Sequence, residues 1–269
     1  MPRHEVHRWS VGAIDITRVA DPEFELILPQ DDDTRAVLKA TPWLHPEFVT
    51  DDQALRIGSS AVVIRTPSLT IVVDPFLAFD DPARLAPRLA ALRAAGADPE
   101  AVDVVLNTHI DGIGANVLAD GSPAFPSARY LVPKAELDDA AAGIHGEPGA
   151  YLTALAAKGL VDAVDGTETL APGVHLEDAP GHSPGMVVAW IDSGGQQAVV
   201  VGHLLLHPAQ IANPDVHTGD LDPVVLAATR RELLLRCAES GALLVGPLFA
   251  APGAGTVQPE GAAWRLDLA

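Results

Sequence analysis

Residues 104–116 read Val-Val-Leu-Asn-Thr-His-Ile-Asp-Gly-Ile-Gly-Ala-Asn, and this stretch decides how the rest of the chain is interpreted. It is a short apolar run that ends on Thr108 and His109, which is typical of a buried strand that carries polar side chains to the edge of a sheet. His109 and Asp111 carry groups that bind a metal ion or transfer a proton. Gly112, the next residue, carries no such group. The loop is therefore a candidate site with few functional groups.

Two more histidine-bearing segments follow apolar runs later in the chain. Residues 180–185 read Pro-Gly-His-Ser-Pro-Gly and contain His182. Residues 202–208 read Gly-His-Leu-Leu-Leu-His-Pro and contain His203 and His207. Because each segment comes directly after a predicted strand, we expect the three loops to meet at one edge of the sheets.

Composition limits the classes of function. The 269 residues are enough for one large domain or two small ones, and a hydrophobic content of 48% supplies a sizeable core. The net charge of −19 disfavours binding to nucleic acids and to anionic membranes, which attract clusters of Lys and Arg. We therefore expect neither nucleic acid nor a membrane surface as a partner.

Cysteine content and hydropathy limit the compartment. Cys237 is the single cysteine, which excludes an internal disulfide and a cysteine-rich zinc site. It lies in a predicted helix, so we expect a buried, inert thiol. No run of about 18 apolar residues predicts a membrane span, and the N-terminal residues lack the apolar core of a signal peptide. We expect a soluble, cytoplasmic protein.

Short β-branched runs bounded by Gly and Pro alternate with Ala- and Leu-rich helical segments. The pattern predicts a hairpin, three helices and further strands: strands 61–66 and 69–74 (the hairpin), 102–106, 128–132, 173–177, 186–192, 197–201, 243–246 and 263–268, and helices 82–95, 134–142 and 223–240. The acidic residues Asp31, Asp32 and Asp33 are interpreted as an exposed turn or a flexible loop. This order of elements predicts two sheets covered on the outside by helices, an α/β layered domain.

These loops resemble those of the metallo-β-lactamase-fold superfamily, in its branch of lactonase-like and organophosphate-hydrolase-like hydrolases. The resemblance runs nearly from end to end and rests on order and spacing: the strand ending at Asp74, residues 128–136, 180–185, 205–210, 229–234 and 252–255. It implies an αββα four-layer sandwich, with two mixed sheets flanked by helices. It also implies a single domain over residues 1–269, with residues 1–52 as an N-terminal extension packing on it.

The family's metal-binding motif is degenerate in this chain. The motif Thr-His-x-His-x-Asp-His is followed in the family by a later His, a bridging Asp and a final His, which together hold two metal ions. His109 and His182 match it, whereas Asp111 replaces either the second His or the Asp, and Gly112 replaces the last His. Later departures are His203 at the bridging Asp, Leu248 at the final His, and Met186 at the second His of the Pro-Gly-His-Thr-Pro-Gly-His pattern. The resemblance therefore implies one metal ion at most.

Several chemistries remain open for these groups. His109, His182 and His203, with Asp111 as a fourth ligand or a general base, suit one zinc or iron ion, since three His and a water form a catalytic zinc pattern. Such a site hydrolyses a small ester, lactone or related metabolite. Without metal, the same four residues form an acid–base set for a lyase, cyclase or isomerase. The third alternative is a ligand-binding pseudoenzyme without catalysis. Relatives of this kind are commonly dimers, so a homodimer is one expectation.

Other polar residues near these loops are interpreted as structural. We expect Asp74 to hold its loop through hydrogen bonds to backbone N–H groups. Arg230 and Arg231 are expected to pair with surface acids, although one of them has the reach to turn inward. Ser183 is expected to cap a turn, and His207 is expected to belong to its loop and its packing.

Overall fold

The computed structural model describes residues 5–22, 24–77, 84–110, 116–142 and 147–269. Two seven-stranded sheets lie face to face. The first has the order β1 (Glu5–Val11), β2 (Ile14–Ala20), β5 (Ser60–Arg65), β6 (Thr70–Val73), β7 (Val104–Leu106), β8 (Arg129–Pro133) and β9 (Val161–Val164). The second has the order β10 (Thr169–Ala171), β11 (Val174–Asp178), β12 (Val187–Ser193), β13 (Gln196–Val200), β14 (Leu243–Val245), β15 (Ala254–Glu260) and β16 (Ala263–Leu268).

Both sheets are mixed. Strands β1, β2, β5 and β6 pair antiparallel, and β6 to β9 pair parallel. In the second sheet β13 and β14 pair parallel, and the other neighbours pair antiparallel. A separate hairpin pairs β3 (Leu26–Leu28) with β4 (Leu55–Ile57). Polar residues that follow β6, β7 and β13 therefore come out at the same edge of the sandwich.

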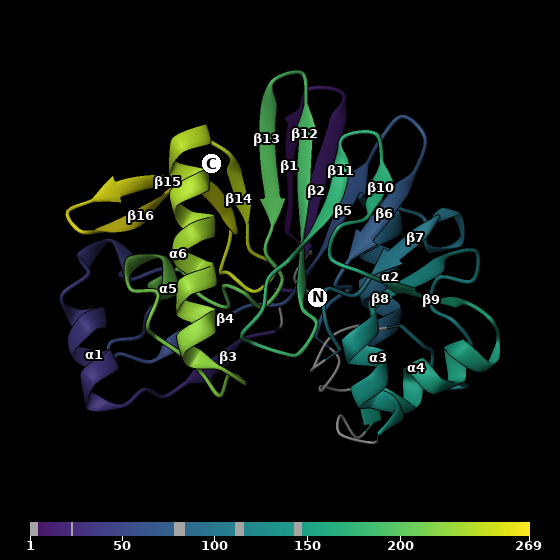
Figure 1. The fold of residues 1–269 in the computed structure, drawn as a ribbon, viewed down its shortest axis with the longest axis horizontal. Helices are drawn as coiled ribbons and strands as arrows, with labels where there is room; N and C mark the ends of the chain where they lie inside the picture. Colours follow the sequence, from purple (N-terminus) through teal and green to yellow (C-terminus); the bar gives the residue numbers. More distant parts are fainter. Residues whose placement is uncertain (1–4, 23, 78–83, 111–115, 143–146) are drawn as a thin grey trace.

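Helices cover the two outer faces (Figure 1). The helices are α1 (Asp32–Lys39), α2 (Leu85–Ala94), α3 (Lys134–Ala141), α4 (Glu147–Ala157), α5 (Ala209–Ala212) and α6 (Pro223–Ser240), with 3₁₀ turns at Pro42–Leu44 and Pro99–Ala101. Helix α6 packs on the second sheet through Leu226, Leu234 and Cys237. Leu92 of α2 and Leu155 of α4 pack on the outside of the first sheet. The expected αββα sandwich is confirmed.

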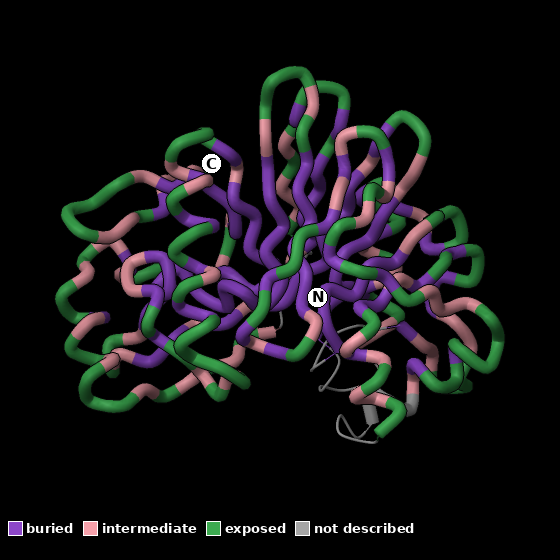
Figure 2. The backbone as a smooth tube through the Cα atoms, viewed as in Figure 1, coloured by how far each residue is buried: buried purple, intermediate pink, exposed green. Residues whose placement is uncertain are grey.

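The largest apolar core lies between the sheets (Figure 2). Ile16 and Ile64 of the first sheet and Ile191 and Val200 of the second are fully buried there. These side chains belong to alternating, β-branched positions, which is why the sequence predicted most of these strands. No helix in the described part of the chain is long and apolar enough to cross a membrane.

The N-terminal region departs from the sequence interpretation. Asp31 to Asp33 do not form a loop: Asp31 is the N-cap of α1, and its carboxylate accepts a hydrogen bond from the Thr34 N–H at 2.7 Å. Asp32 and Asp33 lie in the first turn, where negative charge is favoured by the helix dipole. Residues 1–52, expected as an extension, contribute β1 and β2 to the first sheet, where β2 pairs with β5.

Candidate metal centre

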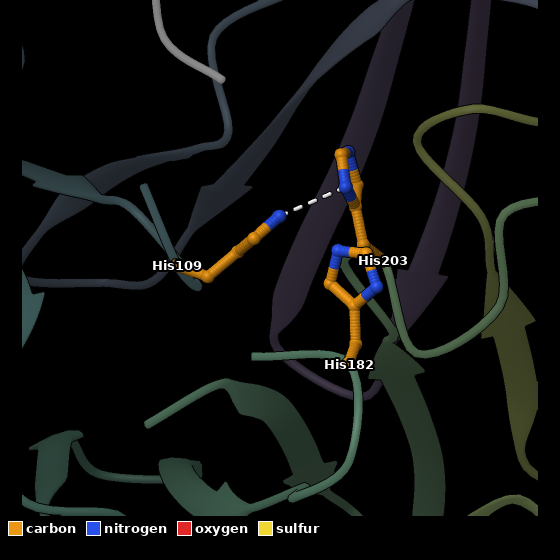
Figure 3. A group of neighbouring side chains, drawn as sticks. All are labelled: His109, His182 and His203. Atoms are coloured by element: carbon orange, nitrogen blue, oxygen red, sulfur yellow. Dashed lines mark hydrogen bonds between the residues drawn. The ribbon is translucent and has the colours of Figure 1, made fainter. Parts of the chain in front are cut away.

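Three histidines from three separate segments meet at one edge of the sandwich (Figure 3). His109 follows β7, His182 lies between β11 and β12, and His203 follows β13. The ring centroid of His109 lies 5.0 Å from that of His182 and 4.1 Å from that of His203. One nitrogen of each ring lies within 4.8 Å of the other two. Among the described residues, these three form the one group of His, Cys, Asp or Glu side chains placed to hold a metal ion.

A glycine brings the two sheets close enough for this meeting. Gly202 precedes His203 and has a φ of +51°, a conformation that residues with a Cβ rarely adopt. A Cβ on Gly202 would lie 2.5 Å from Oγ1 of Thr108. The backbone of the second sheet therefore touches the residue before His109, which places His203 beside His109.

The proton on His109 is fixed by a chain of hydrogen bonds. Asp74 accepts from the N–H of Thr108 at 2.8 Å and from its hydroxyl at 2.7 Å. Since that hydroxyl hydrogen points to Asp74, its oxygen is left to accept from Nδ1 of His109, at 3.2 Å. Burial raises the pKa of Asp74 to about 7, against the effect of the two hydrogen bonds from Thr108. With Nδ1 protonated, Nε2 of His109 presents a lone pair.

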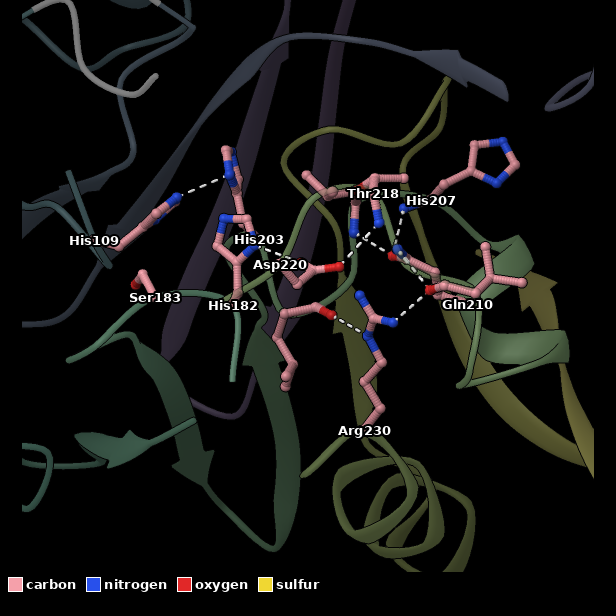
Figure 4. Close-up of polar contacts among 12 residues, drawn as sticks. His109, His182, Ser183, His203, His207, Gln210, Thr218, Asp220 and Arg230 are labelled. Carbon is pink, nitrogen blue, oxygen red and sulfur yellow. Dashed lines mark hydrogen bonds and ion pairs between the residues drawn. The ribbon is translucent and has the colours of Figure 1, made fainter. Parts of the chain in front are cut away.

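His182 is oriented by a carboxylate. Its Nδ1 lies 2.6 Å from Oδ1 of Asp220, whose side chain is fully buried (Figure 4). Burial by itself raises the pKa of Asp220, but the hydrogen bonds from His182 and from the Thr218 N–H outweigh it, and the pKa is lowered. An ionised Asp220 keeps the proton on Nδ1 of His182. Nε2 of His182 is buried without a hydrogen-bond partner, and Figure 3 shows it facing the space between His109 and His203.

His203 completes the group from the second sheet. Its Nδ1 lies 2.8 Å from Nε2 of His109, and its own Nε2 is buried without a hydrogen-bond partner. Burial, with a smaller contribution from the neighbouring His182, lowers the pKa of His203 well below its usual value. The ring is therefore neutral near pH 7, the state in which imidazole binds a metal ion.

A buried glutamate joins the loops that carry His109 and His182. Glu136 of α3 accepts hydrogen bonds from the Ser183 hydroxyl at 2.5 Å and the Gly185 N–H at 3.0 Å. The Ile110 N–H lies 3.3 Å from its other carboxylate oxygen. One side chain from α3 thus fixes two loops of the site relative to each other.

The three imidazoles fit one cation. A tetrahedral zinc ion with bonds of about 2.0–2.1 Å needs ligand nitrogens about 3.3 Å apart. The 2.8 Å pair of His109 and His203, and the 4.8 Å limit for the whole group, require side-chain adjustments of no more than about 1–1.5 Å. The buried, unpartnered Nε2 of His182 and the carboxylate behind that ring are also what a metal-binding imidazole set requires.

The remaining residues of the sequence motif lie elsewhere. Asp111 and Gly112 lie outside the described residues. Leu248, which the sequence motif aligns with the family's final His, is buried in an apolar cluster with Leu44 and Phe48. Met186 is buried in the core beneath α6. The described positions therefore add no further ligand to the three imidazoles.

One structural expectation was wrong, and the others agree with the contacts. Arg230 takes the inward direction that was left open for one of the two arginines: it is fully buried and donates to the carbonyls of Leu204, Pro214 and Val216 (Figure 4). Ser183 does not cap a turn, because its hydroxyl donates to Glu136. Asp74 holds its loop as expected, and Arg231 pairs with Asp215.

His207 belongs to the packing of its own loop, as expected. Its Nδ1 accepts from the Ala209 N–H at 2.9 Å, so Nε2 carries the proton and donates to the Phe48 carbonyl at 2.7 Å. Burial lowers its pKa to about 4.

Sequence reasoning missed Asp220 and Glu136. Asp220 follows Gly219 in a polar loop and carries no local pattern. It reaches His182 because the Leu221 N–H donates to the His182 carbonyl and the Asp222 N–H to the Gly181 carbonyl. Glu136 lies in the first turn of α3, where acids are common on helix surfaces.

Comparisons with known proteins agree with this architecture. The family model of the metallo-beta-lactamase superfamily matches residues 55–236. AidC, a dizinc quorum-quenching lactonase, superimposes with a TM-score of 0.82 at 20% identity over 99% of this chain and 98% of its own. The hydrolase AbOPH gives 0.79 at 20% identity, covering 100% and 98%. A probable metal-dependent hydrolase from Staphylococcus aureus gives 0.75 at 17% identity, covering 96% and 99%. No curated protein sequence matches the chain.

The matched region contains β4 to most of α6, and with them all three histidines and the two carboxylates behind them. The solved structures share the fold over nearly the full length of both partners. The chain belongs to the metallo-beta-lactamase superfamily.

Proposed function

We propose that this chain is a hydrolase that acts on a small neutral ester or lactone with a single metal ion held by His109, His182 and His203. The observation that carries the proposal is the meeting of three imidazole nitrogens. Two of them, on His109 and His182, are kept unprotonated because the opposite nitrogen of each ring donates to Thr108 or to Asp220. A zinc or iron ion bound there supplies the Lewis acidity that polarises a carbonyl and makes water nucleophilic near neutral pH. The similarity to a lactonase and other hydrolases supports this class of substrate.

The protein's own groups have distinct tasks in this proposal. Asp220 holds the His182 ring and its tautomer, and the Asp74–Thr108 pair does the same for His109. Glu136 holds the loops that carry His109 and His182 in fixed positions relative to each other. Asp111, as a further ligand or a general base, remains part of the proposal, on the sequence motif alone. The buried acids around the triad favour a substrate without negative charge.

Metal content per chain tests the proposal directly. We expect about one zinc or iron ion per chain in protein purified without a chelator or a histidine tag. His182→Ala should lose the ion and the hydrolysis of esters and lactones, whereas His217→Ala, at an exposed histidine outside the triad, should keep both. Protein that stays free of metal in excess zinc would overturn the proposal, and two ions per chain would overturn the single-ion site.

A specific contact favours one alternative function. The 2.6 Å contact between His182 and Asp220 resembles the base-and-orienter pair of metal-free acid–base catalysis. In that case the protein acts as a lyase, cyclase or isomerase, and turnover persists after treatment with chelator. A folded, metal-free protein that retains a co-purified ligand without turnover would instead indicate a pseudoenzyme.

A further inference from the structure

A cavity outside the metal centre has none of the three histidines in its lining. Its volume is about 340 Å³, within the range of small-molecule sites. The end of β2, strand β4 and the segment after Leu248 form its walls. Phe24, Ile57 and Phe249 are its large apolar residues, and Glu5, Arg18 and Arg56 are among its charged ones.

One wall of this cavity contains a buried arginine, Arg18. It lies on the same face of β2 as Ile14 and Ile16, which point into the core between the sheets, and its side chain is 1% exposed. Its two terminal nitrogens donate to the carbonyls of Phe249 and Pro252. Its Nε is buried and has no hydrogen-bond partner.

The backbone around Arg18 is shaped to admit the guanidinium group. Gly253 has a φ of +79°, and a Cβ there would lie 2.4 Å from Cζ of Arg18. The flat guanidinium group therefore lies directly against a backbone that bears no side chain.

Arg56, Glu25 and Asp21 of the cavity wall are paired with opposite charges, which leaves Arg18 and Glu5. Arg56 pairs with Glu25 at 2.5 Å, and Asp21 pairs with Arg88 at 2.8 Å. Glu5 is exposed, and it partly offsets the effect of burial, which lowers the pKa of Arg18 to about 10. A buried cation whose hydrogen bonds go to neutral carbonyls is destabilised until an anion joins it.

We propose that this cavity binds the carboxylate of a small molecule with an apolar body, with Arg18 as the partner of the carboxylate. A carboxylate neutralises the buried guanidinium and accepts from the Nε–H, the donor that the two carbonyls leave unused. Phe24, Ile57 and Phe249 then contact the apolar body. The site is independent of the three histidines and of the function proposed for them.

The test compares two probes of the same shape. Hexanoate carries a carboxylate, and hexanamide is its neutral counterpart. Titration calorimetry on the full chain in the His182→Ala background excludes capture of hexanoate by a metal ion at the triad. We expect saturable binding of hexanoate and at least tenfold weaker binding of hexanamide. Equal affinities, or no saturable hexanoate binding, would overturn the proposal.

Variants assign the effect to the cavity. Arg18→Met should abolish the preference for hexanoate. Should that variant fail to fold, Glu5→Gln decides, because removing an exposed like charge should strengthen hexanoate binding by about twofold to fivefold. Glu100→Gln, at an exposed acid outside the cavity, should leave the affinity unchanged. Hexanoate affinity that is the same in the Glu5 variant and its control would contradict the assignment.

Discussion

Replacement of Asp220 by asparagine is the sharpest test of the metal centre. One carboxylate oxygen of Asp220 lies 2.6 Å from Nδ1 of His182, and the other accepts from the Thr218 N–H at 2.9 Å. Asparagine offers one oxygen and one NH₂ group, so it satisfies one of these donors and opposes the other. If the NH₂ group faces His182, the ring proton moves to Nε2 and blocks the lone pair that faces the other two histidines.

The expected magnitude follows from the role of the contact. Loss of a carboxylate behind a metal-binding histidine weakens metal affinity by about 10- to 100-fold. This corresponds to about 1.4–2.7 kcal/mol of binding free energy. The side chain of Asp220 is fully buried and that of His182 is 8% exposed, so solvent screens their interaction little.

Zinc affinity is measured by competition with a chromogenic chelator at pH 7.5, and thermal unfolding checks that the variant is folded. Asp215→Asn is the matched control, because Asp215 is exposed and pairs with Arg231 rather than with a histidine. A folded Asp220→Asn variant that binds zinc within twofold of the parent would refute the reasoning.

Three further predictions concern the framework around the site. Gly202→Ala places a Cβ 2.5 Å from Oγ1 of Thr108 at a φ of +51°, so urea denaturation should show a loss of about 1–3 kcal/mol, and unchanged stability would contradict the close approach. His207 protonates near its ordinary pKa of 6.5 when unfolded but near 4 when folded, so stability should fall as the pH drops from about 6.5 to about 4, by about 3 kcal/mol in total. His207→Gln should flatten that part of the pH–stability profile, and an equally steep profile in this variant would show that another group titrates. Cys237 is buried, which raises its pKa to about 12, so a thiol reagent at pH 8 should label it in urea and leave the native protein unlabelled.

Local sequence patterns were sufficient to predict a helix or strand where its buried positions follow the helical or strand period. The helix predicted over 223–240 has those bounds in the structure, because Asp222 caps its start and Gly241 ends it at a φ of +68°. The strands before His109 and His203 were predicted from their apolar runs. Since both runs end at the same edge of the sandwich, the sequence also indicated which histidines lie near each other.

Other features depend on contacts between distant segments and left little local signal. Strands β1 and β2 were not predicted, because polar residues interrupt them and their stability comes from pairing with β5. Asp220 meets His182 only through the docking of the loop before α6. Arg230 did leave a signal: it lies on the helix face of Leu226, Leu233 and Leu234, all buried, so its inward direction was readable from helical spacing.

The three histidines come from both sheets, and His109 and His203 are 94 positions apart in the sequence. In the unfolded chain they are far apart, so a cation held as proposed binds the folded state and cross-links the two halves of the sandwich. At a free concentration 100 times its dissociation constant, such a ligand adds about 2.7 kcal/mol to the stability. The cellular lifetime of the protein would then follow the metal supply, because chains made under metal starvation open more often and are exposed to proteases for longer.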